Sequence, residues 1–135
     1  MRKTKKDKNR LPPFVAIFYT LLDSKAYKEL SHSTAHALPY FFRKVKLNQN
    51  HPEYYTTDFE FSYTEAEKAG FSRATFNKII KELVEVGFID PLYKGGLRGD
   101  KKSCSRFTLS IRWKDYGTDK HEAISWSQFI GFQPF

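Results

Sequence analysis

The sequence has few of the residues and segments on which exported, membrane-spanning or metal-dependent proteins rely. Its 135 residues include one cysteine, Cys104, so an internal disulfide is excluded and the cytoplasm is the simplest compartment. No apolar run reaches the roughly 18 residues that a membrane-spanning helix needs. We therefore expect a cytoplasmic protein with no membrane contact.

One segment has part of the pattern of an export signal. The apolar residues 14–22 follow a basic start, and the small residues Ser24 and Ala26 come soon after them. Against this reading, two prolines open the run, and a tyrosine and a threonine interrupt it. Its apolar residues also recur at helical spacing, so we interpret the segment as a helix that packs on the protein.

Motifs of common catalytic centres are missing as well. The chain has no GxSxG nucleophile motif and no GxxxxGK[ST] phosphate-binding loop. His32 and His36 could share one face of a helix, with His51 as a distant third ligand, but no cysteine pair completes a zinc site. We expect no enzymatic activity, no metal site and no cofactor.

Aromatic and basic residues, in contrast, are abundant. The chain is 40% hydrophobic and 17% aromatic, which predicts one compact domain with extensions and excludes general disorder. Its 23 Lys and Arg against 15 Asp and Glu give a net charge of +8, and the basic residues gather in residues 1–10, 73–81 and 94–106. This distribution favours a polyanionic partner, although a protein that is merely basic and soluble is the alternative.

Residues 1–10 hold six of the basic side chains and almost nothing apolar. They are predicted to form a flexible arm that grips phosphates without reading sequence, with an affinity that falls as salt rises. A solubilising tail is the alternative.

Two helices separated by a tight turn are predicted in residues 62–86. Ser62 and Glu65 have the spacing of a capping box, and Gly70 suits a left-handed helix stop. Ser72 is a good N-cap for a second helix over residues 73–86, in which apolar residues recur at helical spacing. The polar side chains left on its outer side are Arg73, Thr75, Asn77, Lys78 and Lys81.

These polar side chains have the chemistry that reads DNA. Arginine and lysine donate to guanine or to phosphate, asparagine pairs with adenine, and threonine offers a methyl or a hydroxyl. The ordinary wet side of an amphipathic helix is the alternative interpretation.

A basic hairpin is predicted next, with strands over residues 88–93 and 105–111. Pro91 indicates an edge strand or a bulge. The loop between the strands is rich in glycine, which lets backbone approach a phosphate or the minor groove closely. The basic residues of this hairpin are Lys94, Arg98, Lys101, Lys102 and Arg106.

The flanking segments are predicted to complete one fold. Helices are expected over residues 13–22, 24–30 and 33–46, where Pro39 should kink the last helix or delay its start, and a third strand over 59–61. The apolar C-terminal segment should dock on its own core, with a homodimer contact as the alternative; its large apolar residues are Trp126, Phe129, Ile130 and Phe132.

Residues 59–117 resemble the winged helix-turn-helix domains of bacterial and phage DNA-binding proteins. The resemblance rests on residues 63–66, 70–76 and 82–89 and on the basic hairpin. Residues 110–117 also resemble the end of small replication-initiator-like or mobile-element proteins. The resemblance implies an α+β, mainly helical fold with a short wing, in which residues 73–86 form the recognition helix.

The sequence thus predicts four segments: a basic arm (1–10), a helical extension (11–58), a winged-helix domain (59–117) and an aromatic tail (118–135). The expected partner is double-stranded DNA, for a transcriptional regulator or a replication-associated factor of a bacterium or mobile element. Structured RNA is a rival ligand. A protein-interaction module that uses the aromatic tail is the rival function.

Overall fold

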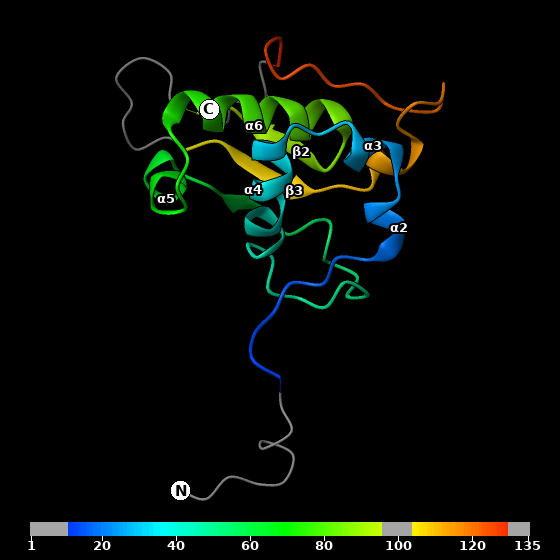
Figure 1. Ribbon diagram of the computed structural model, residues 1–135, viewed down its shortest axis with the longest axis horizontal. Coiled ribbons are helices and arrows are strands. Elements are labelled where there is room, and N and C mark those ends of the chain that lie inside the picture. The colour runs from blue at the N-terminus through cyan, green and yellow to red at the C-terminus, as the bar shows by residue number, and fades with distance from the viewer. Residues whose placement is uncertain (1–10, 96–103, 130–135) are drawn as a thin grey trace, which may run out of the picture.

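The computed structural model describes residues 11–95 and 104–129, which form an α+β fold (Figure 1). This fold class confirms the coarse prediction from the sequence. The elements in chain order are α2 (Tyr19–Leu22), α3 (Lys25–Lys28), α4 (His32–Phe42), β1 (Phe59–Glu60), α5 (Tyr63–Lys68), α6 (Arg73–Val86), β2 (Ile89–Tyr93), β3 (Arg106–Leu109) and the 3₁₀ helix η1 (Arg112–Asp115).

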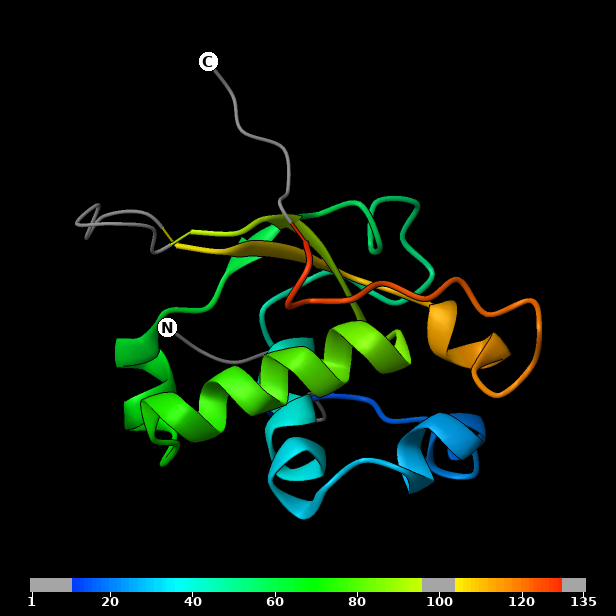
Figure 2. The ribbon, with the colours of Figure 1, turned by 90° about the horizontal axis from the view of Figure 1, so that it is seen from above.

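Helix α6 is the central element of the fold. It contacts α4, α5 and β2, and Figure 2 shows it running alongside the sheet with α5 at its N-terminal end. Its buried side carries the five apolar residues predicted at helical spacing and, in addition, Val84. The core they join extends from Leu21 to Trp126, so the N-terminal helices and the C-terminal segment share it.

The three strands form an antiparallel sheet in the order β1-β3-β2. The third strand expected near Phe59 is present, and Phe59 pairs with Phe107 of β3. Strand β2 lies at the edge, and its register with β3 shifts between Pro91 and Tyr93. Both expectations for Pro91 are therefore confirmed, because an edge position and a bulge each accommodate a residue without an N–H.

The α5–α6 pair forms as its sequence signals predict. Ser62 and Glu65 make a reciprocal capping box, in which the Glu65 N–H donates to Ser62 Oγ at 3.1 Å and the Ser62 N–H to Glu65 Oε1 at 2.9 Å. Gly70 has a φ of +98°, and Ser72 caps α6. Three local signals within eleven residues thus fix where one helix ends and the next begins.

The N-terminal helices differ from the prediction. Of residues 13–22, only Tyr19–Leu22 is helical, because prolines at the start favour extended backbone and the core covers only some of the apolar side chains that follow, among them Ile17 and Leu21. The expected helix over 24–30 is confined to Lys25–Lys28. Phe14 remains 72% exposed, so the predicted packed stripe is wrong there.

Helix α4 begins at His32, one residue before the predicted start, and continues past Pro39, so the alternative of a later start is wrong. Its start is fixed by Ser31, which accepts the Thr34 N–H at 3.3 Å. The carboxylate of Glu82 on α6 accepts both the backbone N–H of Ser31 at 2.9 Å and its hydroxyl at 2.8 Å. These interactions satisfy the helix end and tie α4 to α6. The helix also ends four residues earlier than the predicted Lys46, at Phe42.

The segment after β3 is held by Arg112 and Trp126. The predicted strand over 105–111 ends at Leu109, and η1 follows it. The guanidinium of Arg112 donates to the Asp90 carboxylate and to the backbone carbonyls of Val84, Ile89 and Glu122. These bonds join α6, β2 and the C-terminal segment.

Trp126 lies in the core, with its ring 5.6 Å from that of Phe107 and 6.0 Å from that of Phe129. The C-terminal segment as far as Phe129 therefore packs on its own chain. Ile130 and Phe132 lie outside the described residues. Among the helices that the structure describes, none has the length and apolarity to cross a membrane.

Candidate nucleic-acid interface

The outer side of α6 carries the polar residues that the sequence analysis selected. Arg73, Asn77, Lys78 and Lys81 are exposed, and Thr75 is half-buried. This division follows from the helical period, since Phe76, Ile79, Ile80 and Leu83 turn the opposite side into the core. The structure therefore brings the four exposed residues to one side of the molecule.

The polar residues on the outer side of α6 differ in their local contacts. Thr75 accepts a hydrogen bond from the Ser72 hydroxyl at 3.0 Å, so it takes part in the N-cap. Lys81 makes an ion pair of 3.2 Å with Glu85, which offsets part of its charge. Lys78 has no ion pair within residues 11–95 and 104–129, and its ammonium is available to an anion.

Arg73 and Asn77 share a partner that the sequence analysis missed. The guanidinium of Arg73 lies over the ring of Tyr63, 4.2 Å from its centroid. The Tyr63 hydroxyl donates to Asn77 Oδ1 at 2.7 Å. Because Tyr63 is the first residue of α5, the turn between α5 and α6 brings it beside the exposed side of α6. The spacing of residues in the sequence does not predict this contact.

The two described basic residues of the hairpin are held within the chain. Lys94 donates to the Trp126 carbonyl at 2.8 Å, and its ammonium lies 4.6 Å from the centre of the Trp126 indole. Arg106 pairs with Asp58 at 2.6 Å and with Glu60 at 2.7 Å. The predicted role of both in gripping DNA backbone is thus opposed by intramolecular partners. Arg98, Lys101 and Lys102 lie outside the described residues, as does the basic segment 1–10.

The ion pair between Arg106 and Asp58 shifts the pKa values of both groups. The hydrogen bond from Arg106 holds the pKa of the Asp58 carboxyl below its ordinary value, and the same bond raises the pKa of Arg106. Both groups are therefore charged at neutral pH. The ion pair joins β3, which carries Arg106, to the residue that precedes β1, Asp58.

A small hollow of about 110 Å³ lies between α5, α6 and the hairpin. Tyr63 and Asn77 line one side, while Lys94 and Cys104 line the other. Burial raises the pKa of the Cys104 thiol, so the thiol is neutral and weakly nucleophilic at pH 7. In Figure 2 the loop ends of β2 and β3 lie on the same side of the molecule as α5, which agrees with this arrangement.

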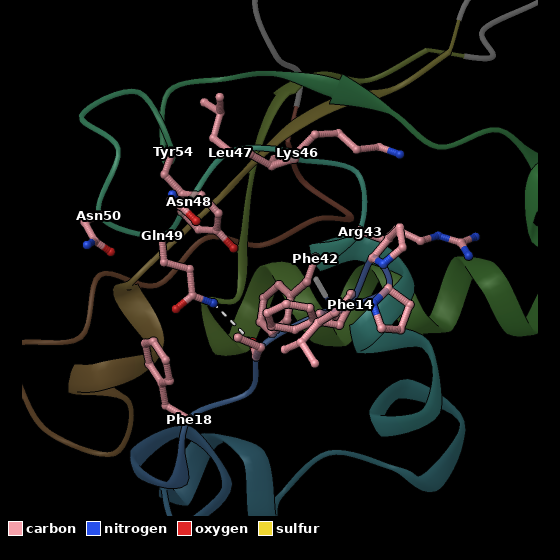
Figure 3. A pocket seen from close by; sticks show the side chains of 16 residues that line it. Phe14, Phe18, Phe42, Arg43, Lys46, Leu47, Asn48, Gln49, Asn50 and Tyr54 are labelled. Carbon is pink, nitrogen blue, oxygen red and sulfur yellow. Dashed lines mark hydrogen bonds between the residues drawn. The ribbon is translucent and has the colours of Figure 1, made fainter. Parts of the chain in front are cut away.

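A larger, open hollow of about 1040 Å³ lies between residues 11–18 and the segment that follows α4 (Figure 3). Phe14 and Phe42 line it, and Gln49 Nε2 donates across it to the Ala16 carbonyl at 3.1 Å. Its lining contains no carboxylate, histidine or cysteine. No cluster of three metal-binding side chains occurs in the part of the chain that the structure describes.

Comparisons of the chain with protein-family models, with curated proteins and with solved structures found no match.

Proposed function

We propose that this chain is a winged-helix protein that binds double-stranded DNA, as a transcriptional regulator or a replication-associated factor of a bacterium or mobile element. The proposal is supported by the order α4, β1, α5, α6, β2, β3 and by the sheet order β1-β3-β2, in which a helix pair precedes an antiparallel hairpin. In this assignment α6 is the recognition helix and the β2–β3 hairpin is the wing. The proposal includes no catalytic step.

The observation that carries the proposal is the division of α6 into two sides. One side is apolar and buried, and the other presents Arg73, Asn77, Lys78 and Lys81 to solvent. An α-helix fits the major groove, where such side chains reach base edges and phosphates. The positive N-terminal end of α6 also favours a phosphate. The net charge of +8 adds a sequence-independent attraction.

The proposal is tested by fluorescence anisotropy of the full chain with a labelled random DNA duplex across a salt series. We expect the logarithm of the affinity to fall linearly with the logarithm of the salt concentration. An RNA duplex of the same sequence is the comparison ligand, and it should bind more weakly because its deep, narrow major groove does not admit a helix. Equal or tighter binding of RNA would favour the rival ligand, and no binding at low salt would refute the proposal.

A protein-interaction module is the second candidate, and one observation favours it. Leu11, Phe14, Phe18 and Tyr19 are between 58% and 83% exposed in one N-terminal stretch. Isolated apolar residues at a surface are common, but a group of this size is typical of a contact surface. The aromatic C-terminal tail, proposed from sequence as this surface, places Trp126 in the core. If this candidate is right, Phe14→Ser with Phe18→Ser should abolish binding of a partner or a second copy, whereas Arg73→Ala with Lys78→Ala should leave that binding intact.

A further inference from the structure

The contact between α5 and α6 holds a cluster of three polar side chains. It comprises the side chains of Tyr63, Arg73 and Asn77, and its interpretation rests on the proposed DNA-binding function. The ring of Tyr63 is fixed on the core by an edge contact with the buried Phe76, at 5.8 Å between centroids and an interplanar angle of 78°. A residue anchored in this way can orient exposed neighbours.

The Tyr63 hydroxyl determines which atoms of Asn77 remain available. It donates to Oδ1 at 2.7 Å, so the amide turns its oxygen toward Tyr63. The amide nitrogen is bonded to the same carbon and faces away from the oxygen, with two N–H donors. Within the described ranges, neither this nitrogen nor the guanidinium of Arg73 has a hydrogen-bond partner. The cluster therefore presents mainly donors to a ligand, because one lone pair of the amide oxygen is already used by Tyr63.

The bases differ in which hydrogen-bond acceptors and donors their edges present in the major groove. Guanine presents two acceptors, O6 and N7, and thymine presents one, O4. Adenine presents an acceptor and a donor, and an asparagine reads it by using both its oxygen and its nitrogen. Because Tyr63 holds the amide in one orientation and uses one lone pair of its oxygen, Asn77 makes that bidentate pair less readily. This differs from the sequence-based expectation, in which Asn77 pairs with adenine.

We infer that Tyr63 is a specificity-determining positioning residue that makes the Arg73 and Asn77 pair select acceptor edges of DNA. Arg73 reads guanine bidentately, and Asn77 prefers guanine or thymine over adenine at its own position, because adenine offers it one acceptor beside a donor. Tyr63 itself need not touch the DNA. It acts by holding the guanidinium over its ring and the amide oxygen on its hydroxyl.

The test is selection of bound duplexes from a library with a randomised centre, followed by sequencing. The wild type should enrich sites with guanine at one position and with guanine or thymine at a second. Arg73→Ala should lose the preference at the first position, and Asn77→Ala at the second, which assigns each position to its residue.

Tyr63→Phe is the decisive variant, because it retains the ring under Arg73 and removes the hydroxyl alone. We expect it to accept adenine at the Asn77 position and to lower the ratio of guanine to adenine affinity there by at least about fivefold. Its affinity for random duplex should not change. Tyr19→Phe, which removes the hydroxyl of an 83% exposed tyrosine on α2, is the matched control and should keep the wild-type preferences.

Three results would overturn the inference while leaving DNA binding standing. They are adenine at the Asn77 position of wild-type sites, identical preferences in the wild type and Tyr63→Phe, and salt-dependent binding with no enriched sequence. The last result would mean that the cluster contacts phosphates. If the chain binds no duplex, the proposed function itself fails and the inference fails with it.

Discussion

The region from β1 to η1 and the N-terminal region from Leu11 to Leu30 bury their large aromatic residues to different extents. In the first, Phe76 and Phe88 are at most 1% exposed, and polar caps define the helix ends. In the second, Phe14 and Phe18 are 72% and 58% exposed, and both helices have four residues. Apolar content alone therefore does not produce a packed helix. A helix forms where capping residues and a partner surface coincide with it.

The largest expected effect comes from truncating one aromatic residue in each region. Phe76→Ala should lower the free energy of unfolding by about 3 to 5 kcal/mol, because it leaves a cavity under α6. Phe14→Ala should change it by less than about 0.5 kcal/mol. Urea unfolding followed by circular dichroism measures both. Equal losses would show that residues 11–18 belong to the core.

The next effect concerns Arg112, which donates to four acceptors in the packed region. Arg112→Met should cost about 3 kcal/mol, since it leaves the Asp90 carboxylate and three carbonyls without this donor. Lys114→Met removes an exposed charge two residues away and is the matched control. A small loss in Arg112→Met, comparable to that in the control, would contradict the assigned role of Arg112.

The two glycines that end α5 and α6 sharpen the comparison within the packed region. Both have positive φ, +98° at Gly70 and +107° at Gly87. A Cβ at Gly87 would lie 2.7 Å from the Trp113 nitrogen, whereas one at Gly70 would meet nothing within 4 Å. Gly70→Ala should cost about 1 kcal/mol from backbone strain alone, and Gly87→Ala about 2 kcal/mol or more. Thermal unfolding of the two variants should rank them in this order, and the reverse order would refute the packing at Gly87.

The smallest effect is the acid dependence of the Asp58 and Arg106 pair. Because the pKa of Asp58 is lowered in the folded state, the stabilisation is present above the ordinary value of 3.8 and is lost as pH falls through the folded value. The pair is about 40% exposed, so the effect should stay below about 1 kcal/mol.

Urea unfolding of Asp58→Asn from pH 7 to pH 3 measures this term. The variant should be less stable than the wild type at pH 7, and the difference should shrink toward pH 3. Asp119→Asn, in an exposed position, is the control. A difference that stays constant with pH would show that the carboxylate does not stabilise the fold through its charge.

Sequence signals predicted the region around α6 closely because they are local. Ser62 with Glu65, Gly70 and Ser72 are each satisfied by backbone within a few residues, and the period of α6 needs only one partner surface. The start of α4 was predicted to within one residue, but the bond of its N-cap Ser31 to Glu82 was missed because the two residues lie 51 positions apart. The Tyr63 contact with Asn77 was missed for the same reason, since it depends on how α5 crosses α6.

The hairpin shows a different limit of sequence reasoning. Its basic residues were grouped by charge, but the acidic partners of Arg106 lie on and before β1, and the partner of Lys94 is a carbonyl of the C-terminal segment. Counting cations in one segment does not show which of them are neutralised by another. The polar side of α6 stays exposed because no other described element of the chain covers Lys78.

The central claim, that the exposed side of α6 binds DNA, is tested most directly by removing its charge and measuring affinity for a random duplex. Arg73→Ala with Lys78→Ala should weaken binding and reduce the slope of log affinity against log salt by about one for each lost phosphate contact. The control pair Lys28→Ala with Lys120→Ala removes the same charge from exposed sites on α3 and after η1, and should retain more affinity and more of the slope. Equal losses in the two double variants would mean that net charge alone drives binding, and would contradict the assignment of α6 as the DNA-binding helix.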